Sequence, residues 1–227
     1  MIKIWENFYV KSGKKNLFFP SETLVRCFKG DYIKNFEFKK IGNYNCKILD
    51  VGFGSGNNLV FLNSLGFKVF GTEVSNKICS TTKKRLLKLK INCNLKKGTN
   101  TKIPFKNSFF DCLISWDVIH YEKNIQSYKN AIKEYLRVLK PNGRLILSTA
   151  APQSSLFKKS LRINRNVVVC KNKKDIRYNK KFICFKNINA FKKLYINKFY
   201  DCNFGRHTSI IFSENYDSFL FTGKKYL

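Results

Sequence analysis

Histidine is scarce in this chain, and its cysteines do not occur in closely spaced pairs. There are two histidines, His120 and His207, and none of the eight cysteines belongs to a C-x-x-C pair. Structural zinc sites are built from such closely spaced cysteine and histidine ligands. The C-x-x-x-C-x-x-C run of iron–sulfur radical enzymes is missing as well. We therefore expect no metal site, and we interpret the scattered cysteines as small, mostly buried side chains in a reducing compartment.

Long apolar runs are also missing. No window approaches the roughly 18 apolar residues of a membrane-spanning helix. The first residues, MIKIWENFYVKSGKK, mix charged with apolar side chains and do not have the pattern of a signal peptide. The 227 residues, 44% of them hydrophobic, suffice for one domain with a buried core. We expect a single domain located in the cytoplasm.

Acidic residues are few, so 44 basic and 14 acidic residues give a formal charge of +30. A charge of this size can indicate a polyanionic partner such as nucleic acid. However, 36 of the basic residues are lysine and 8 are arginine, whereas nucleic-acid readers rely on arginine for bidentate contacts. The bias towards Lys, Asn, Phe and Ile is also what an AT-rich coding sequence produces. We favour compositional drift, and a nucleic-acid partner is the alternative.

Short apolar runs alternate with helical patterns through the middle of the chain. Strands are predicted at 46–52, 67–73, 91–98, 109–117 and 144–150, and helices at 56–66, 76–89 and 124–140. Gly66 can end the first helix, and Ser75 can cap the second. Alternating strands and helices imply crossover connections and a parallel sheet, so the predicted fold class is α/β.

The pattern changes after residue 150. Residues 151–186 are predicted to be irregular, and the stretch 158–193 holds thirteen Lys or Arg and a single acid, Asp175. Its interleaved lysines and aromatic residues would suit a phosphorylated metabolite, a nucleotide-linked sugar or stacking on nucleic acid. A solvated basic face is the simpler interpretation. A helix at 187–197, a strand at 198–204 and an antiparallel strand pair around 208–213 and 218–225 are predicted to follow.

The most informative stretch is KILDVGFGSGNN, residues 47–58. A predicted strand runs into Asp50, and Gly52, Gly54 and Gly56 follow. A phosphate-binding P-loop is excluded because G-x-x-x-x-G-K-[ST] is missing. The dinucleotide fingerprint G-x-G-x-x-G fails because Asn57 stands at the position of its third glycine.

Two carboxylates indicate what the loop holds instead. Asp50 lies at the mouth of the loop, where it would repel a pyrophosphate but suits a cationic group. Glu73 ends the next predicted strand, and a carboxylate there can accept both hydroxyls of an adenosine ribose. These residues fit an adenosine that carries a cation and no phosphates, which is the description of S-adenosylmethionine. A nicotinamide-dependent oxidoreductase is the rival class, and Asp50 and Asn57 count against it.

Four motifs, in order over residues 46–150, resemble those of class I S-adenosylmethionine-dependent methyltransferases, in particular the methyltransferase type 11 group. They are ILDVGFGSGNNLVFL, GFKVFGTEVS, GTNTKIPFKNSFFDCLISWDVIHY and AIKEYLRVLKPNGRLILST. The leader WENFY…PSETLVR, at 5–26, is similar to the opening of some members that act on small molecules. The resemblance implies a Rossmann-like, doubly wound, mostly parallel seven-stranded sheet with an antiparallel C-terminal strand and helices on both faces.

The resemblance also implies one methyltransferase domain over 1–227. Residues 1–45 would form a helical leader or cap, 46–150 the cofactor-binding core, 151–186 a basic insertion on the acceptor side, and 187–227 a C-terminal helix and strands that complete the sheet. In the core, Asp50, Gly52, Gly54 and Gly56 would line the methionine part of the cofactor, and Glu73 would bind the ribose.

Five further residues are assigned to the cofactor by the resemblance. Val74 would pack on the adenine, and Thr99 and Asn100 would lie at the adenine edge, although the family often has Asp where Thr99 stands. Ser115 and Trp116 would lie beside the methionine. Val74 can equally be an ordinary core residue, and Thr99 an ordinary turn residue.

The resemblance implies methyl transfer from S-adenosylmethionine to an oxygen or nitrogen of a small molecule, which the basic segment would suit if the acceptor is anionic. Aligning the acceptor can contribute ~7–11 kcal/mol, and a base can be needed to take its proton. SWDVIHY supplies Asp117 and His120 as candidates; Asp117 can also be a helix cap, and His120 a structural residue.

Other functions are kept open by the sequence. The Asn/Asp-Pro-Pro-aromatic run typical of enzymes that methylate amino groups of bases or glutamine is replaced by SWDV, which disfavours that chemistry. The alternatives are an RNA or ribonucleoprotein methyltransferase and a non-catalytic cofactor-binding protein, because a fold does not fix a function. The sequence predicts no oligomeric state.

Overall fold

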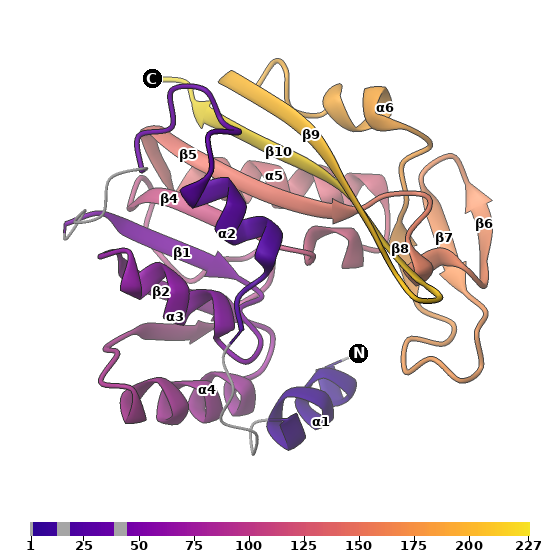
Figure 1. The fold of residues 1–227 in the computed structure, drawn as a ribbon, viewed down its shortest axis with the longest axis horizontal. Coiled ribbons are helices and arrows are strands. Elements are labelled where there is room, and N and C mark those ends of the chain that lie inside the picture. The colour runs from indigo at the N-terminus through magenta and orange to yellow at the C-terminus, as the bar shows by residue number, and fades with distance from the viewer. Residues whose placement is uncertain (1, 13–18, 39–44) are drawn as a thin grey trace.

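The computed structural model describes residues 2–12, 19–38 and 45–227. Its centre is a seven-stranded sheet in the order β3-β2-β1-β4-β5-β10-β9 (Figure 1). The strands are β1 (Lys47–Val51), β2 (Lys68–Glu73), β3 (Asn94–Lys97), β4 (Phe110–Ser115), β5 (Leu139–Ala150), β9 (Phe199–Ile211) and β10 (Glu214–Lys225). β1 to β5 pair in parallel, and β10 runs antiparallel to both of its neighbours. The predicted fold class is confirmed.

Helices cover both faces of the sheet. Successive residues of a strand point to opposite faces, and Ile48 of β1 packs with α3 (Asn57–Ser64), α4 (Asn76–Lys88) and α2 (Glu22–Lys29). Leu49 packs on the other face with Tyr135 of α5 (Ile125–Val138) and with α6 (Ile188–Lys192). A strand buried on both faces is apolar at successive positions, as Ile48, Leu49 and Val51 of β1 are.

The helix ends follow local sequence signals. The Ser75 hydroxyl accepts hydrogen bonds from the backbone N–H groups of Lys77 and Ile78, at 3.1 and 3.4 Å, and so caps α4 as predicted. Asn124 and Ser127 form a capping box at the start of α5. Gly66 follows α3 with φ +91°, a backbone conformation that glycine adopts without strain.

The prediction that residues 151–186 are irregular is wrong. After the short 3₁₀ helix η2 (Ser155–Phe157) they form an antiparallel sheet of β6 (Ser160–Asn164), β7 (Val167–Cys170) and β8 (Lys181–Ile183). Val168, Cys170 and Phe182 make a small apolar core with Tyr121 and Phe157. All four residues of β7 are buried, so its sequence lacks the alternation that marks a half-buried strand.

Several predicted boundaries also need correction. The segments predicted as strands at 198–204 and 208–213 are parts of one strand, β9, and α6 is shorter than predicted. β5 begins at Leu139, not at residue 144, because the strand continues through the residues PNG. Asn142 there has φ +62°, and the pairing of β5 with β4 shifts register between Phe110 and Cys112. The leader contains α1 (Ile2–Ser12) and α2, while its residues 13–18 and 39–44 lie outside the described residues.

The strand order reverses between β1 and β4, which lie side by side in the sheet. Ligands of open α/β sheets bind at the carboxyl ends of the strands at such a switch point. Asp50 lies near the carboxyl end of β1 and the glycine loop follows that strand, while Trp116 and Asp117 follow β4. Within the residues that the structure describes, no helix combines the length and the apolar character needed to cross a membrane.

Candidate active site

The loop after β1 needs its glycines. Gly52, Gly54 and Gly56 have φ of +72°, +53° and +84°, where other residues are strained. A Cβ atom at each would also meet a neighbour closely: Val118 at 2.5 Å, Tyr9 at 2.6 Å and Thr82 at 2.7 Å, respectively. The loop therefore lies tightly between the segment after β4, helix α1 and helix α4.

The Asp50 carboxylate lies below this loop and is 1% exposed. Its Oδ2 atom is buried and has no hydrogen-bond partner among the described residues. Burial, and then the charge of Glu73, raise the pKa of Asp50 well above its usual range. An unpartnered buried carboxylate is unfavourable, so this site is complementary to a cation or a strong donor.

Glu73 ties the end of β2 to the same loop. Its Oε2 accepts a hydrogen bond from the Gly54 N–H at 3.2 Å, and its Oε1 accepts one from the Val74 N–H at 2.7 Å. Burial raises the pKa of Glu73, and these two hydrogen bonds lower it. Each carboxylate oxygen can accept a further hydrogen bond, as a pair of ribose hydroxyls would require.

Helix α1 covers the loop. The Tyr9 ring lies against Gly54, and Trp5 stacks on Tyr9 and packs edge-on against Tyr121, with ring centroids 5.8 and 5.2 Å apart. The Ser75 hydroxyl donates a hydrogen bond to the Glu6 carboxylate. Burial, followed by the charge of Glu73, raises the pKa of Tyr9. The sequence analysis missed Tyr9, for which the aromatic pattern WENFY was the available signal.

The structure places the remaining predicted cofactor residues in different surroundings. Val74 is half-buried beside Glu73, and Thr99 is exposed in a turn. Ser115 and Asn100 are buried and joined through Tyr135, whose hydroxyl lies 3.0 Å from Ser115 Oγ and donates to Asn100 Oδ1 at 2.7 Å. The side chains of Ser115 and Asn100 are thus held in the protein interior.

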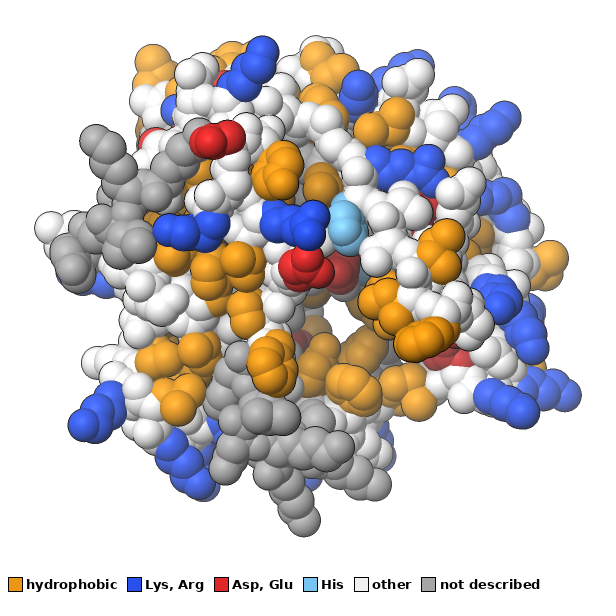
Figure 2. Space-filling model, in the orientation of Figure 1, with side chains coloured by type: hydrophobic (Ala, Val, Ile, Leu, Met, Phe, Trp, Pro, Cys, Tyr) orange, Lys and Arg blue, Asp and Glu red, His pale blue; other side chains and the backbone are white. Residues whose placement is uncertain are grey.

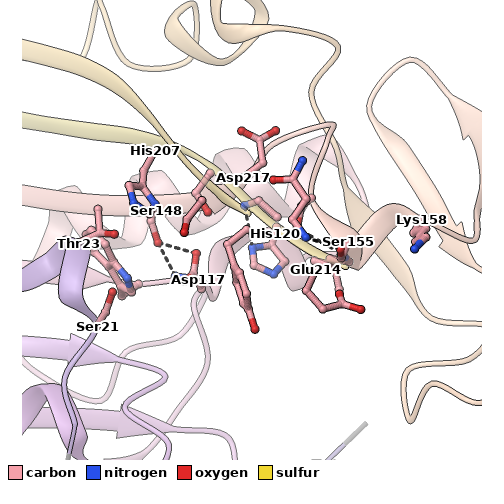
Figure 3. Close-up of a pocket in the computed structure, with 18 of the residues that line it drawn as sticks. Ser21, Thr23, Asp117, His120, Ser148, Ser155, Lys158, His207, Glu214 and Asp217 are labelled. Atoms are coloured by element: carbon pink, nitrogen blue, oxygen red, sulfur yellow. Dashed lines mark hydrogen bonds between the residues drawn. The ribbon is translucent and has the colours of Figure 1, made fainter. Parts of the chain in front are cut away.

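A cavity of about 750 Å³ opens beside Trp116. Its walls are the segment after β4, the end of β5, the leader around residues 21–23, the β9–β10 hairpin and the small sheet (Figure 3). Figure 2 shows the hollow near the middle of one face, with a histidine and acidic side chains close to it and most lysines and arginines towards the edges. Val118, the residue after Asp117 of the cavity lining, packs against Gly52 of the glycine loop.

Asp117 opens onto this cavity from a left-handed backbone conformation, φ +54°, a type of local strain that is common at functional sites. The Asp117 Oδ1 atom accepts a hydrogen bond from Ser148 Oγ at 2.7 Å, and the Asp117 backbone N–H donates one to Ser148 Oγ at 2.8 Å. Removal from water raises the pKa of Asp117, while hydrogen bonds from Ser148 and Ser218 and a charge on His207 lower it.

His120 also reaches the cavity but is 3% exposed. Its Nδ1 accepts a hydrogen bond from the Ala150 N–H at 3.4 Å. Burial, and then the charge of Arg177, lower the pKa of His120 to about 3. The imidazole is therefore neutral at physiological pH. Asp117 and His120, both predicted as candidate bases, lie on one wall (Figure 3).

Three features of the cavity were not found from the sequence. His207 enters it from β9, and Ser218 lies opposite His207 on β10. The leader is attached through two asparagines: Asn57 donates to the Phe19 carbonyl at 3.0 Å, and Asn58 accepts from the Ser21 N–H at 3.1 Å. Asn57, which the sequence analysis treated as a missing glycine, thus anchors the leader.

Comparison with known proteins agrees with this geometry. Residues 49–147 match a family model described as a methyltransferase domain. The ubiquinone biosynthesis O-methyltransferase of Pelagibacter ubique is 27% identical over 150 residues, which is 65% of this chain and 61% of that protein. The ubiquinone/menaquinone biosynthesis C-methyltransferase of Pseudomonas savastanoi is 28% identical over 120 residues, 50% of this chain and 46% of the relative. The chain thus spans about half to three-fifths of these relatives.

A crystal structure of a Methanosarcina mazei S-adenosylmethionine-dependent methyltransferase superposes with a TM-score of 0.70 at 18% identity, covering 83% of this chain and 96% of that one. This likeness shows that the chain has the fold of the class I S-adenosylmethionine-dependent methyltransferases. Residues 49–147, somewhat less than half of the chain, match this methyltransferase domain, in agreement with the resemblance of the four sequence motifs to the methyltransferase type 11 group. S-adenosylmethionine is the cofactor of the class.

Proposed function

We propose that this chain is an enzyme that transfers a methyl group from S-adenosylmethionine to an oxygen or nitrogen of a small polar molecule. The observation that carries the proposal is the buried Asp50 carboxylate with an unpartnered oxygen under a three-glycine loop, at the same sheet edge as a cavity of about 750 Å³. The loop suits a cationic cofactor without phosphates, and the cavity has room for an acceptor.

The cofactor, when bound, supplies a methyl group on a sulfonium centre. Asp50 would pair with the cationic methionine part along Gly52, Gly54 and Gly56, and Glu73 would accept the ribose hydroxyls. Trp116 would separate the methionine part from the cavity.

The other assigned residues would act at the edges of the cofactor site. Val74 and the Thr99–Asn100 turn would lie along the adenine. Because the Asn100 and Ser115 side chains are already engaged with Tyr135, we propose that they shape the site from behind.

Asp117 is the better placed base of the two candidates. It opens onto the cavity and is held by Ser148, whereas the His120 pKa of about 3 makes that imidazole a weak base. A carboxylate whose pKa is raised by partial removal from water is closer to the optimum for taking a proton near neutral pH.

The charges of the cavity support a small acceptor over nucleic acid. Its lining includes five acidic side chains and three Lys or Arg, so the +30 charge of the chain is not concentrated there. Lys158 and Lys159 lie on the lining and could hold an anionic group of the acceptor. The relatives' names refer to quinone biosynthesis, but most of the cavity wall, from Ser148 onward, lies outside the matched residues 49–147.

The location that we propose is the cytoplasm. All eight cysteines are unpaired, and burial raises the pKa of the Cys112 thiol well above its usual range, which keeps it unreactive. Unpaired cysteines suit a reducing compartment.

Cofactor binding tests the proposal directly. We expect S-adenosylhomocysteine, the demethylated product, to raise the melting temperature of the protein, and Asp50→Asn to remove that shift. Asp111→Asn is a matched control, because Asp111 pairs with Lys140 at the opposite end of β4, and it should retain the shift. An intact protein whose melting temperature does not respond to the product would contradict the proposal.

A further inference from the structure

Aliphatic hydroxyl groups recur around the lining of the cavity. Seven of its lining side chains are Ser or Thr, whereas four are aliphatic hydrocarbons. The hydroxyls come from separate parts of the chain: the leader, the end of β5, the segment around η2 and both strands of the β9–β10 hairpin. They therefore surround the space from several sides.

A hydroxyl-lined cavity selects for an acceptor with hydroxyls of its own. Each Ser or Thr can both donate and accept hydrogen bonds, and a polyol offers the same two capacities at every carbon. Ser148 and Ser218 are already hydrogen-bonded to Asp117. An apolar acceptor chain would leave the hydroxyls that are not engaged within the protein without partners, which is unfavourable. Ser155, for example, accepts a hydrogen bond from the Asn215 N–H at 2.8 Å and keeps its own O–H to donate.

The cavity has two chemically different ends. Asp117, Ser148 and His207 lie together at one end, and Lys158 lies at the other (Figure 3). The Asp117 end is next to the glycine loop, because Val118 packs against Gly52. An acceptor would thus present one hydroxyl to Asp117 and direct its remote substituent towards Lys158 and Lys159.

We propose, on the basis of the proposed methyl transfer, that the acceptor is a polyhydroxylated, saccharide-type molecule with an anionic substituent, and that it is methylated on a hydroxyl oxygen. The acceptor oxygen forms a bond to the methyl carbon while the carbon–sulfur bond of S-adenosylmethionine breaks and its electron pair returns to sulfur. The hydroxyl proton passes to the Asp117 carboxylate. The product is a methyl ether of the saccharide.

A defined acceptor panel tests the substrate class. The protein is incubated with S-adenosylmethionine carrying a deuterated methyl group and one of four additions: sugar phosphates with nucleotide sugars, dihydroxybenzoates with and without an isoprenyl tail, phosphoethanolamine, or a bacterial cell extract. Mass spectrometry locates the label. We expect labelled methyl ethers of saccharides in the first arm or in the aqueous phase of the extract.

Label on a phenol, an amine or an organic-phase product would overturn the saccharide assignment. Absence of label in every arm, from a protein whose melting temperature still rises with S-adenosylhomocysteine, would instead contradict methyl transfer itself, and the inference would fall with it. The two failures are therefore distinguishable.

Two variants test the roles of the lining residues with the acceptor so found. Asp117→Asn should lower kcat about 100-fold or more and leave the shift with S-adenosylhomocysteine intact. Ser209→Ala should raise the acceptor KM about fivefold with little change in kcat, as expected for one lost hydrogen bond. Ser80→Ala, on the exposed side of α4, is the control and should change neither. Equal kinetics of Ser209→Ala and the control would count against hydroxyl recognition.

Discussion

The ring of Tyr9 lies so close to Gly54 that a Cβ atom added at Gly54 would stand 2.6 Å from its Cε1 atom. Helix α1 is thereby fitted to a loop that lies more than forty residues away in the sequence. The contact joins helix α1 to the glycine loop, the two segments between which we propose that the cofactor binds.

Gly54→Ala should lower the free energy of unfolding by about 1–2 kcal/mol for the left-handed backbone alone, and by more because the new methyl group displaces the Tyr9 ring. In a Tyr9→Ala background the part due to the ring should vanish. A double-mutant cycle by urea denaturation measures this coupling. An equal cost of Gly54→Ala in both backgrounds would show that α1 does not close on the loop in solution.

His120 makes stability depend on pH. Its pKa is lowered from 6.5 to about 3 in the folded protein. Between these two values the imidazole is protonated in the unfolded state and neutral in the folded state. The free energy of unfolding should therefore fall as the pH is lowered below 6.5, by about 3 kcal/mol between pH 7 and pH 4 from this residue. Urea denaturation of the wild type and of His120→Gln gives the difference, in which the contributions of Asp50, Glu73 and Asp117 cancel. Parallel curves for the two proteins would rule out a buried neutral imidazole.

His207→Gln should move the acidic limb of the pH–rate profile to higher pH. A charged His207 lowers the pKa of Asp117, so its removal raises the pH at which Asp117 becomes ionised and able to take a proton. The expected displacement is measured on kcat/KM with a saturating cofactor concentration. An unmoved limb would mean that the rate does not report the ionisation of Asp117. Ser80→Ala is again the reference, and its profile should overlay that of the wild type.

Asn58→Ala should loosen the leader where it borders the cavity. The Asn58 side chain accepts the Ser21 N–H, and losing that acceptor removes about 0.5–1.5 kcal/mol of local stability. Hydrogen exchange of a peptide that covers residues 19–26 should become faster, while the thermal shift with S-adenosylhomocysteine persists. Asn63→Ala, further along α3, is the control. Unchanged exchange in Asn58→Ala would show that the leader is held by other contacts.

The features of the site that could be predicted from the sequence are those that depend on the local backbone. Three glycines with positive φ and an acid at each of two strand ends leave a readable pattern, and the parallel sheet follows from alternating strands and helices. Tyr9 and His207 were not found, because each reaches the site from a distant segment through packing that no short motif encodes. Lysine-rich composition concealed β6 to β8, whose buried residues do not alternate. In the sequence, Asn57 drew attention only because it stands where the dinucleotide fingerprint has its third glycine. Its hydrogen bond to the Phe19 carbonyl is visible only in the three-dimensional structure.

The small sheet of β6 to β8 has an apolar core of its own, built from Val168, Cys170, Phe182 and Cys184 against Tyr121 and Phe157. It stands between β5 and α6 in the chain and forms part of a cavity wall without contributing a strand to the main sheet. Substitutions in this segment can reshape what enters the cavity while the Asp50–Glu73 loop is untouched. The chain is in this sense modular: the residues that we propose for the donor site all precede the small sheet in the sequence, so this one wall of the acceptor cavity can change while the main sheet, including β9 and β10, stays intact.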